Sequence, residues 1–164
     1  MTSQRWLTDA DSDRSIWWHW LVVVVPSNYN EHTSRNGTLW ITDGKNDHPD
    51  EVPDRFNYNM VIASELAMGT GLVTGALFQV PNQPIIFSSD PIQKKRSEDS
   101  AIAFTWAHFL ENTEDTEWPL RLPMVKASLR AMDTMTAYAA EKLNIKQLDY
   151  YSVTGASKRG WTVR

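Results

Sequence analysis

The stretch at residues 148–161 constrains the fold of this chain more than any other part of its sequence. It begins with residues of high strand propensity, reaches Gly155, Ala156 and Ser157 in succession, and meets a further glycine at Gly160. Glycine and alanine at these positions let the backbone turn sharply and approach its neighbours closely. The pattern predicts a strand that ends in a tight turn, raises the hydroxyl of Ser157 above a sheet, and continues into a helix. This arrangement is called a nucleophile elbow.

A helix that begins after Ser157 would direct free N–H groups toward the hydroxyl, so the backbone N–H of Lys158 is the candidate oxyanion donor. The motif departs from the usual G-x-S-x-G spacing, because Arg159 occupies the position of the second glycine. An ordinary strand–helix junction is therefore the alternative to an elbow. The Lys158 side chain suits an anionic substrate, and a solvated helix start is the alternative for Lys158 and Arg159 alike.

Strand and helix patterns alternate upstream of the elbow. Apolar runs predict strands over 17–25, 38–42 and 72–80, and a last strand from near Gln147 to the elbow. Helical periodicity predicts helices over 57–68, from a cap at Ser97 to about 110, and over 123–143. This order predicts one α/β domain over 1–164, with a mostly parallel sheet and helices on both of its faces.

The loop after the second predicted strand is the next candidate for the site. A glycine there can turn a backbone N–H toward a ligand, so Gly44 is the candidate for a second oxyanion donor, with a plain turn as the alternative. Asp47 and His48 follow in the same loop. As two adjacent residues they are too few for a three-ligand metal site, so we predict no metal.

None of the histidines suits the base of a catalytic triad. His19 lies among tryptophans and is expected to be structural, and His19, His32, His48 and His108 all precede Ser157. In proteins with this elbow, the acid and the histidine follow the serine along the chain. Only seven residues follow Ser157, and none of them is Asp, Glu or His. We therefore expect the chain to carry a nucleophile without its acid and base.

Composition excludes several kinds of site and partner. A formal charge of −4 gives no electrostatic reason to expect a nucleic-acid partner. The absence of cysteine excludes disulfides, thiolate catalysis and cysteine-based zinc sites, and no motif implies a cofactor. The longest apolar run, residues 20–25, is too short to span a membrane. The N-terminus lacks the pattern of a signal peptide, so the chain alone specifies no compartment.

Several motifs occur in the order in which one known family has them. They are MTSQ-x-W at 1–6, DR…W-x-HWL at 13–21, QVPNQP at 79–84, EDS at 98–100, WPLRLPM at 118–124 and GASKRGWT at 155–162. On these motifs, the sequence resembles the PhoPQ-activated pathogenicity-related protein family, which includes a secreted repressor of cell proliferation. The resemblance implies an α/β-hydrolase fold, usual export from the cell, and Ser157 at the nucleophile position. The chain departs from the family at residues 43–46, where the family tends to have a glycine-rich loop and this chain has Gly44 as its one glycine.

The resemblance also implies that the chain is a fragment. Family members carry further strands before these motifs and a long C-terminal half after the elbow. We therefore expect the N-terminal part of an incomplete hydrolase-like domain, truncated just after the elbow. Its last strand would be an unpaired apolar edge, which predicts marginal stability and self-association.

The sequence and the resemblance together suggest two candidate functions, one enzymatic and one not. The first is a serine hydrolase in which Ser157 attacks an ester or amide, with Lys158 and Gly44 as oxyanion donors and with an acid and a base from residues absent here. The second is a non-catalytic secreted signalling protein on a hydrolase scaffold, because fold does not fix function. For the 164 residues taken alone, an inactive product is a third interpretation.

Overall fold

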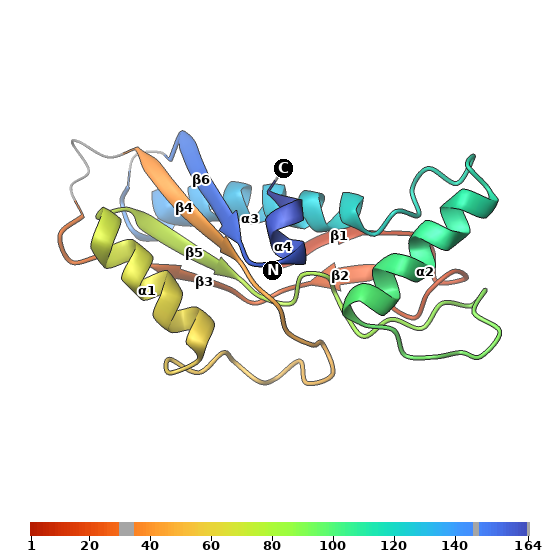
Figure 1. The fold of residues 1–164 in the computed structure, drawn as a ribbon. Helices are drawn as coiled ribbons and strands as arrows, with labels where there is room; N and C mark the ends of the chain where they lie inside the picture. Colours follow the sequence, from red (N-terminus) through yellow and green to blue (C-terminus); the bar gives the residue numbers. More distant parts are fainter. Residues whose placement is uncertain (30–34, 146–147, 164) are drawn as a thin grey trace.

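The structure is a computed structural model that describes residues 1–29, 35–145 and 148–163. The elements within these residues, in chain order, are β1 (Thr2–Arg5), β2 (Ile16–Trp18), β3 (Leu21–Val24), β4 (Asn36–Ile41), α1 (Tyr58–Thr70), β5 (Val73–Leu77), α2 (Glu98–Glu111), α3 (Arg121–Lys142), β6 (Tyr150–Gly155) and α4 (Lys158–Thr162) (Figure 1). The predicted start of the last strand near Gln147 lies outside the described residues. From β4 onward the strands and helices alternate as predicted, β1 was not predicted, and the fold is mixed α/β.

A four-stranded sheet with the order β3-β5-β4-β6 forms the centre of the fold. The strands β5, β4 and β6 are mutually parallel, and β3 pairs with β5 in the antiparallel sense. The register places Leu39 of β4 between Gly75 of β5 and Val153 of β6. Parallel neighbours need long crossover connections. The chain supplies them as α1 between β4 and β5, and as α2 and α3 between β5 and β6, so the predicted mostly parallel sheet is confirmed.

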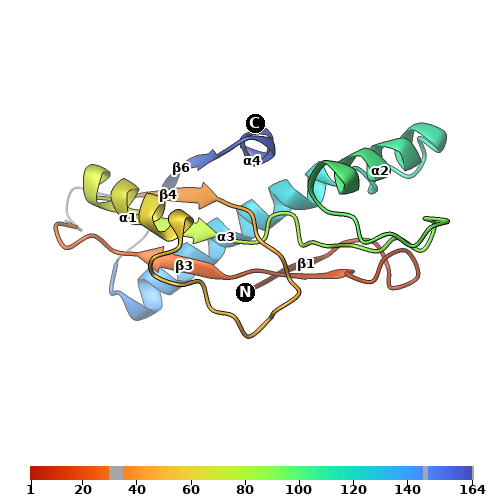
Figure 2. The ribbon, with the colours of Figure 1, turned by 60° about the horizontal axis from the view of Figure 1, so that its bottom comes forward.

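Helices cover both faces of this sheet (Figures 1 and 2). On one face, Ala63 of α1 packs with Ala76 of β5. On the other, Met135 of α3 packs in the main core with Leu39. Gly75 allows this helix to lie close to the sheet, because a Cβ at Gly75 would be only 2.3 Å from the Sδ atom of Met135. The prediction of helices on both faces is confirmed.

The predicted strand over 17–25 is wrong, because the run forms two strands in two different sheets. The first, β2, pairs with β1 in a separate two-stranded sheet, and the second, β3, pairs with β5. His19 lies between them and is fully buried, with its ring nitrogens 3.0 Å from Ser3 Oγ and 3.0 Å from the Phe78 carbonyl. A continuous apolar run in the sequence does not show at which residue the chain leaves one sheet and enters another. The structural role expected of His19 is confirmed.

An aromatic cluster joins the two-stranded sheet to α2. Trp6 meets Trp17 and Phe87 edge to face, with ring centroids 5.5 and 6.2 Å apart. Phe87 in turn stacks on Phe104 of α2 at 4.8 Å and lies 5.8 Å from Trp118. Each such pair stabilises a fold by about 1 kcal/mol in addition to the stabilisation from the apolar area that it buries. This cluster fixes the position of α2, whose first residue contributes to the site described below.

Candidate functional site

The turn between β6 and α4 has the geometry that the sequence predicts. β6 ends at Gly155 and α4 begins at Lys158, so Ala156 and Ser157 form the turn. Ser157 has φ 54° and ψ −124°, a backbone conformation that a residue with a Cβ rarely adopts and that costs roughly 1–3 kcal/mol. Its side chain is exposed and does not cap α4. The role of Ser157 as a nucleophile stays a prediction.

Two glycines allow the turn to close, and they explain its unusual spacing. A Cβ on Gly155 would lie 2.9 Å from the Cβ and 3.0 Å from the carbonyl carbon of Arg159. A Cβ on Gly160 would lie 3.1 Å from the carbonyl oxygen of Gly155. These contacts are tight, so larger residues would push α4 away from the end of β6. In this turn the second glycine is needed at position 160, which leaves position 159 free for a long side chain.

The backbone N–H of Lys158, directly after the turn, is available to a ligand. The Arg159 N–H donates to the Ala156 carbonyl at 3.0 Å, and the Gly160 N–H donates to the Ser157 carbonyl at 2.9 Å. The N–H of Lys158 donates to no residue in the described part of the chain. It follows Ser157 directly, so it is free to donate to an oxygen atom bound beside the Ser157 hydroxyl.

A pocket of about 240 Å³ opens beside the turn. Its lining comes from the end of β4 and the residues after it, from the start of α1 and from the elbow; the lining residues are Trp40, Ile41, Thr42, Asp43, Tyr58, Asn59, Ala156, Ser157 and Arg159. β4 and β6 are parallel neighbours, so their carboxyl ends reach the same edge of the sheet. Ligands of open α/β sheets bind in crevices at this edge.

Gly44 lies outside the lining of this pocket. Its φ of 137° suits glycine, and its carbonyl accepts a hydrogen bond from Gln83 Nε2 at 3.1 Å. It lines a neighbouring pocket with Gln79. The residue of this loop that lines the Ser157 pocket is Asp43, whose carboxylate accepts bonds from Thr42 Oγ1 at 3.2 Å and Asn59 Nδ2 at 3.4 Å.

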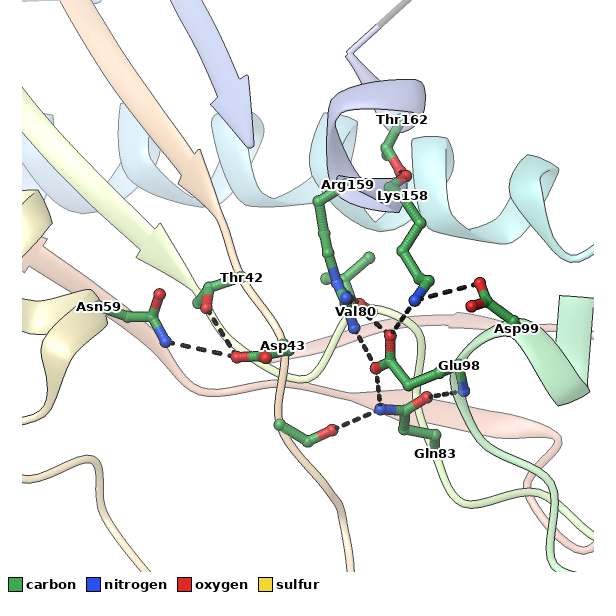
Figure 3. A network of polar contacts seen from close by, with 11 residues as sticks. Thr42, Asp43, Asn59, Val80, Gln83, Glu98, Asp99, Lys158, Arg159 and Thr162 are labelled. Carbon is green, nitrogen blue, oxygen red and sulfur yellow. Dashed lines mark hydrogen bonds and ion pairs between the residues drawn. The ribbon is translucent and has the colours of Figure 1, made fainter. Parts of the chain in front are cut away.

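Arg159 fastens α4 to the first residue of α2 (Figure 3). Its side chain is 7% exposed and forms a bidentate ion pair with Glu98, with Nη1 at 2.8 Å from Oε2 and Nη2 in contact with Oε1. Its Nε donates to the Val80 carbonyl at 2.7 Å. Gln83 donates to Glu98 Oε1 at 2.6 Å and accepts from the Glu98 N–H at 2.8 Å. The alternative of a solvated helix start is therefore wrong for Arg159.

Lys158 joins the same network of charges. Its Nζ lies 2.9 Å from Glu98 Oε2 and 3.1 Å from Asp99 Oδ1, and its side chain is 14% exposed. Partial burial by itself would raise the pKa of Glu98, but the hydrogen bonds from Arg159, Lys158 and Gln83 outweigh it and hold this pKa at about 2. Both cations beside Ser157 are thus matched by carboxylates of α2.

Three residues with strained backbone meet at this place. Besides Ser157, both Glu98 (φ 53°) and Gln79 (φ 63°) have positive φ without being glycine. Gln79 binds the loop after β4, because its N–H donates to the Asp43 carbonyl at 2.9 Å. Strain of this kind persists only where surrounding contacts hold it, and it tends to gather at functional sites.

Sequence patterns do not identify Glu98 and Asp43 as parts of the site. Glu98 follows a predicted helix cap, and a carboxylate there is commonly explained by the helix dipole alone. Its partner Arg159 is 61 positions away along the chain, and no local pattern predicts such a pair. Asp43 immediately precedes Gly44, the glycine that the sequence suggests as an oxyanion donor. The sequence therefore indicates this loop, but it does not indicate that Asp43 lines the pocket.

The described histidines lie elsewhere. His108 pairs with Asp115 at 2.7 Å and stacks on Trp118, while His19 is in the core. His32 lies outside the described residues. Within the described ranges, no side chain forms a hydrogen bond with Ser157 Oγ, and no three histidine or acidic residues are grouped to hold a metal ion. None of the described helices is long and apolar enough to cross a membrane.

Comparison with known proteins gives two matches. The sequence model of the family described as PhoPQ-activated pathogenicity-related protein matches residues 1–163. The autocrine proliferation repressor protein A of Dictyostelium discoideum is 37% identical over 166 residues, which cover 99% of this chain and 30% of the relative. The chain thus spans about a third of the length of this curated relative. No solved structure matches the chain.

Proposed function

The chain belongs to the PhoPQ-activated pathogenicity-related protein family, and we propose that it carries the nucleophile and oxyanion site of a serine hydrolase acting on an ester or amide. The observation that supports this most is the strained backbone of Ser157, at φ 54° between a strand and a helix. An exposed serine on a strained strand-to-helix turn is what a nucleophile elbow requires.

We propose further that the domain is the N-terminal part of an α/β-hydrolase-like fold. The mostly parallel sheet, the helices on both faces and the turn at the carboxyl end of β6 support this. The match to less than a third of the relative supports a longer protein in which further residues complete the domain.

The proposed reaction begins when Ser157 Oγ attacks the carbonyl carbon of the substrate. The negative charge that develops on the carbonyl oxygen is stabilised by the N–H of Lys158 and by a second N–H from the loop after β4. For that second donor we propose Asp43, which lines the pocket, ahead of Gly44, which follows it. The leaving group departs with a proton, and water then hydrolyses the acyl-enzyme.

The proposal requires a general base and an acid that orients it. In this class of site both follow the serine along the chain, and the described residues after Ser157 include no Asp, Glu or His. The base and acid must therefore come from residues beyond those described. Without them, we expect Ser157 to be unreactive.

A second candidate function rests on the relative, which is called an autocrine proliferation repressor. We infer as the alternative that the protein is secreted and acts as a non-catalytic signal on the same scaffold. In that case Ser157 would be a structural residue of the turn, and the clamp formed by Glu98 and Arg159 would serve stability alone.

Fluorophosphonate labelling separates the two functions. The protein is expressed from its complete reading frame, and labelling is compared with Ser157→Ala and with Ser152→Ala, which removes an exposed serine of β6, the strand that precedes the turn. The hydrolase predicts labelling that Ser157→Ala abolishes and Ser152→Ala leaves intact. A folded protein that takes no label favours the signalling function.

A further inference from the structure

We propose that the pocket beside Ser157 binds a positively charged group of the substrate, and that Asp43 is the residue that selects it. This inference rests on the proposed hydrolase function and adds the chemical class of its substrate. The class would be esters or amides that carry an amine or a quaternary ammonium close to the scissile carbonyl.

The charges at the elbow balance one another. Lys158 and Arg159 bring two positive charges beside Ser157, but both are directed onto Glu98, and Lys158 also contacts Asp99. These four charges sum to zero, so neither cation is left to attract an anionic substrate. The sequence-based expectation of an anionic substrate at Lys158 therefore has no support from the arrangement of charges.

The Asp43 carboxylate is positioned to bind a cation. It is exposed at the pocket, and within the described part of the chain it forms no ion pair. Neutral groups hold one of its oxygens, since Thr42 Oγ1 and Asn59 Nδ2 both donate to Oδ1. Asn59 is itself fixed by a hydrogen bond from Trp40 Nε1 at 3.1 Å. The carboxylate is thus held in place through Oδ1, and within the described residues Oδ2 accepts no hydrogen bond, which leaves it able to meet a cation.

The pocket also has an aromatic lining. Trp40 and Tyr58 line the same pocket as Asp43, and aromatic faces attract ammonium groups. The pocket of about 240 Å³ is smaller than a typical site for a drug-sized ligand, so it suits a small cationic group rather than a whole substrate.

The charge that develops during the reaction also favours a substrate with a cationic group. A carboxylate close to a developing oxyanion opposes the charge that forms in the transition state, and a cation on the substrate offsets this repulsion. A substrate with an anionic group in the same position would add a second like charge. Selection by Asp43 would therefore act on the rate of acylation as well as on binding.

Three phosphonate probes of matched shape test the inference. Each is a p-nitrophenyl alkylphosphonate whose alkyl group ends in a trimethylammonium, a tert-butyl or a carboxylate group. Ser157 Oγ attacks phosphorus, the hydroxyl proton passes to the general base, and p-nitrophenolate leaves, so its release reports the rate. The rates are measured on the protein from its complete reading frame, on Asp43→Asn, and on Asp50→Asn as a control. Asp50 is an exposed residue of the same connection that does not line the pocket.

We expect the trimethylammonium probe to react about tenfold faster than the tert-butyl probe, as one ion pair and one cation–π contact would give. This ratio should fall as salt is added. Asp43→Asn, which keeps the hydrogen-bond acceptor, should bring the ratio close to one, and Asp50→Asn should leave it unchanged. Equal rates, a faster carboxylate probe, or a preference that survives Asp43→Asn would overturn the inference while leaving the hydrolase in place. Failure of all three probes to react would overturn the hydrolase and this inference together.

Discussion

At the scale of single residues, His19 shows how burial sets the ionisation of a side chain in this protein. Burial lowers its pKa to about 4 from the ordinary 6.5, although the hydrogen bond to the Phe78 carbonyl acts in the opposite direction. The unfolded chain therefore takes up a proton at higher pH than the folded chain. The contribution of His19 to stability is complete above about pH 6.5 and is lost as the pH falls toward 4.

We predict that the protein loses about 2 kcal/mol more unfolding free energy between pH 7 and pH 5 than a His19→Gln variant does. Urea denaturation at the two pH values measures both. His48→Gln, at an exposed position, serves as the control and should behave as the unmodified protein does. An equal pH dependence in His19→Gln would show that His19 is protonated without cost in the fold.

At the scale of elements, the clamp between α2 and α4 holds the elbow in place. Glu98→Gln would leave the buried Arg159 without its carboxylate, whereas Asp99→Asn removes a carboxylate that is 83% exposed. Because Glu98 is itself 35% exposed, we expect a loss of about 2 kcal/mol for Glu98→Gln, below the range for a fully buried pair, and less than about 0.5 kcal/mol for Asp99→Asn.

Thermal or urea unfolding of the two variants measures this difference, and fluorophosphonate labelling of each reports whether the elbow keeps its geometry. We expect labelling to slow in Glu98→Gln more than in Asp99→Asn. Similar, small effects in both variants would contradict a clamp centred on Glu98.

The elements also show what the sequence predicts and what it leaves open. Alternating strands and helices were enough to predict the parallel sheet, because parallel neighbours require crossovers. The turn at Ser157 was predicted from the small residues Gly155 and Ala156, which let the backbone turn tightly. The division of the 17–25 run and the pairing of Arg159 with Glu98 were not, since both depend on partners distant in sequence.

At the scale of the whole molecule, β6 is an edge strand of the described four-stranded sheet, with β4 as its neighbour. The unpaired backbone groups of such an edge can pair with another chain. We predict that the chain of residues 1–164, prepared alone, self-associates through β6, and that Tyr150→Lys on this strand reduces the association. Tyr58→Lys is the matched control, because Tyr150 and Tyr58 are both 74% exposed and Tyr58 is on a helix.

Sedimentation velocity over a range of concentrations measures this association. The expected result is a larger species that diminishes in Tyr150→Lys and persists in Tyr58→Lys. A monomer at every concentration, with a sharp unfolding transition, would contradict the prediction of a reactive edge.

The central claim is that Ser157 is an activated nucleophile, and mapping the site of fluorophosphonate attachment tests it most directly. The protein from its complete reading frame is labelled and digested, and the modified peptide is identified by mass spectrometry. We predict one label per chain, on Ser157, at the turn between β6 and α4. A label on another residue, or none on a folded protein, would contradict the claim and leave the turn as a structural feature of a signalling protein.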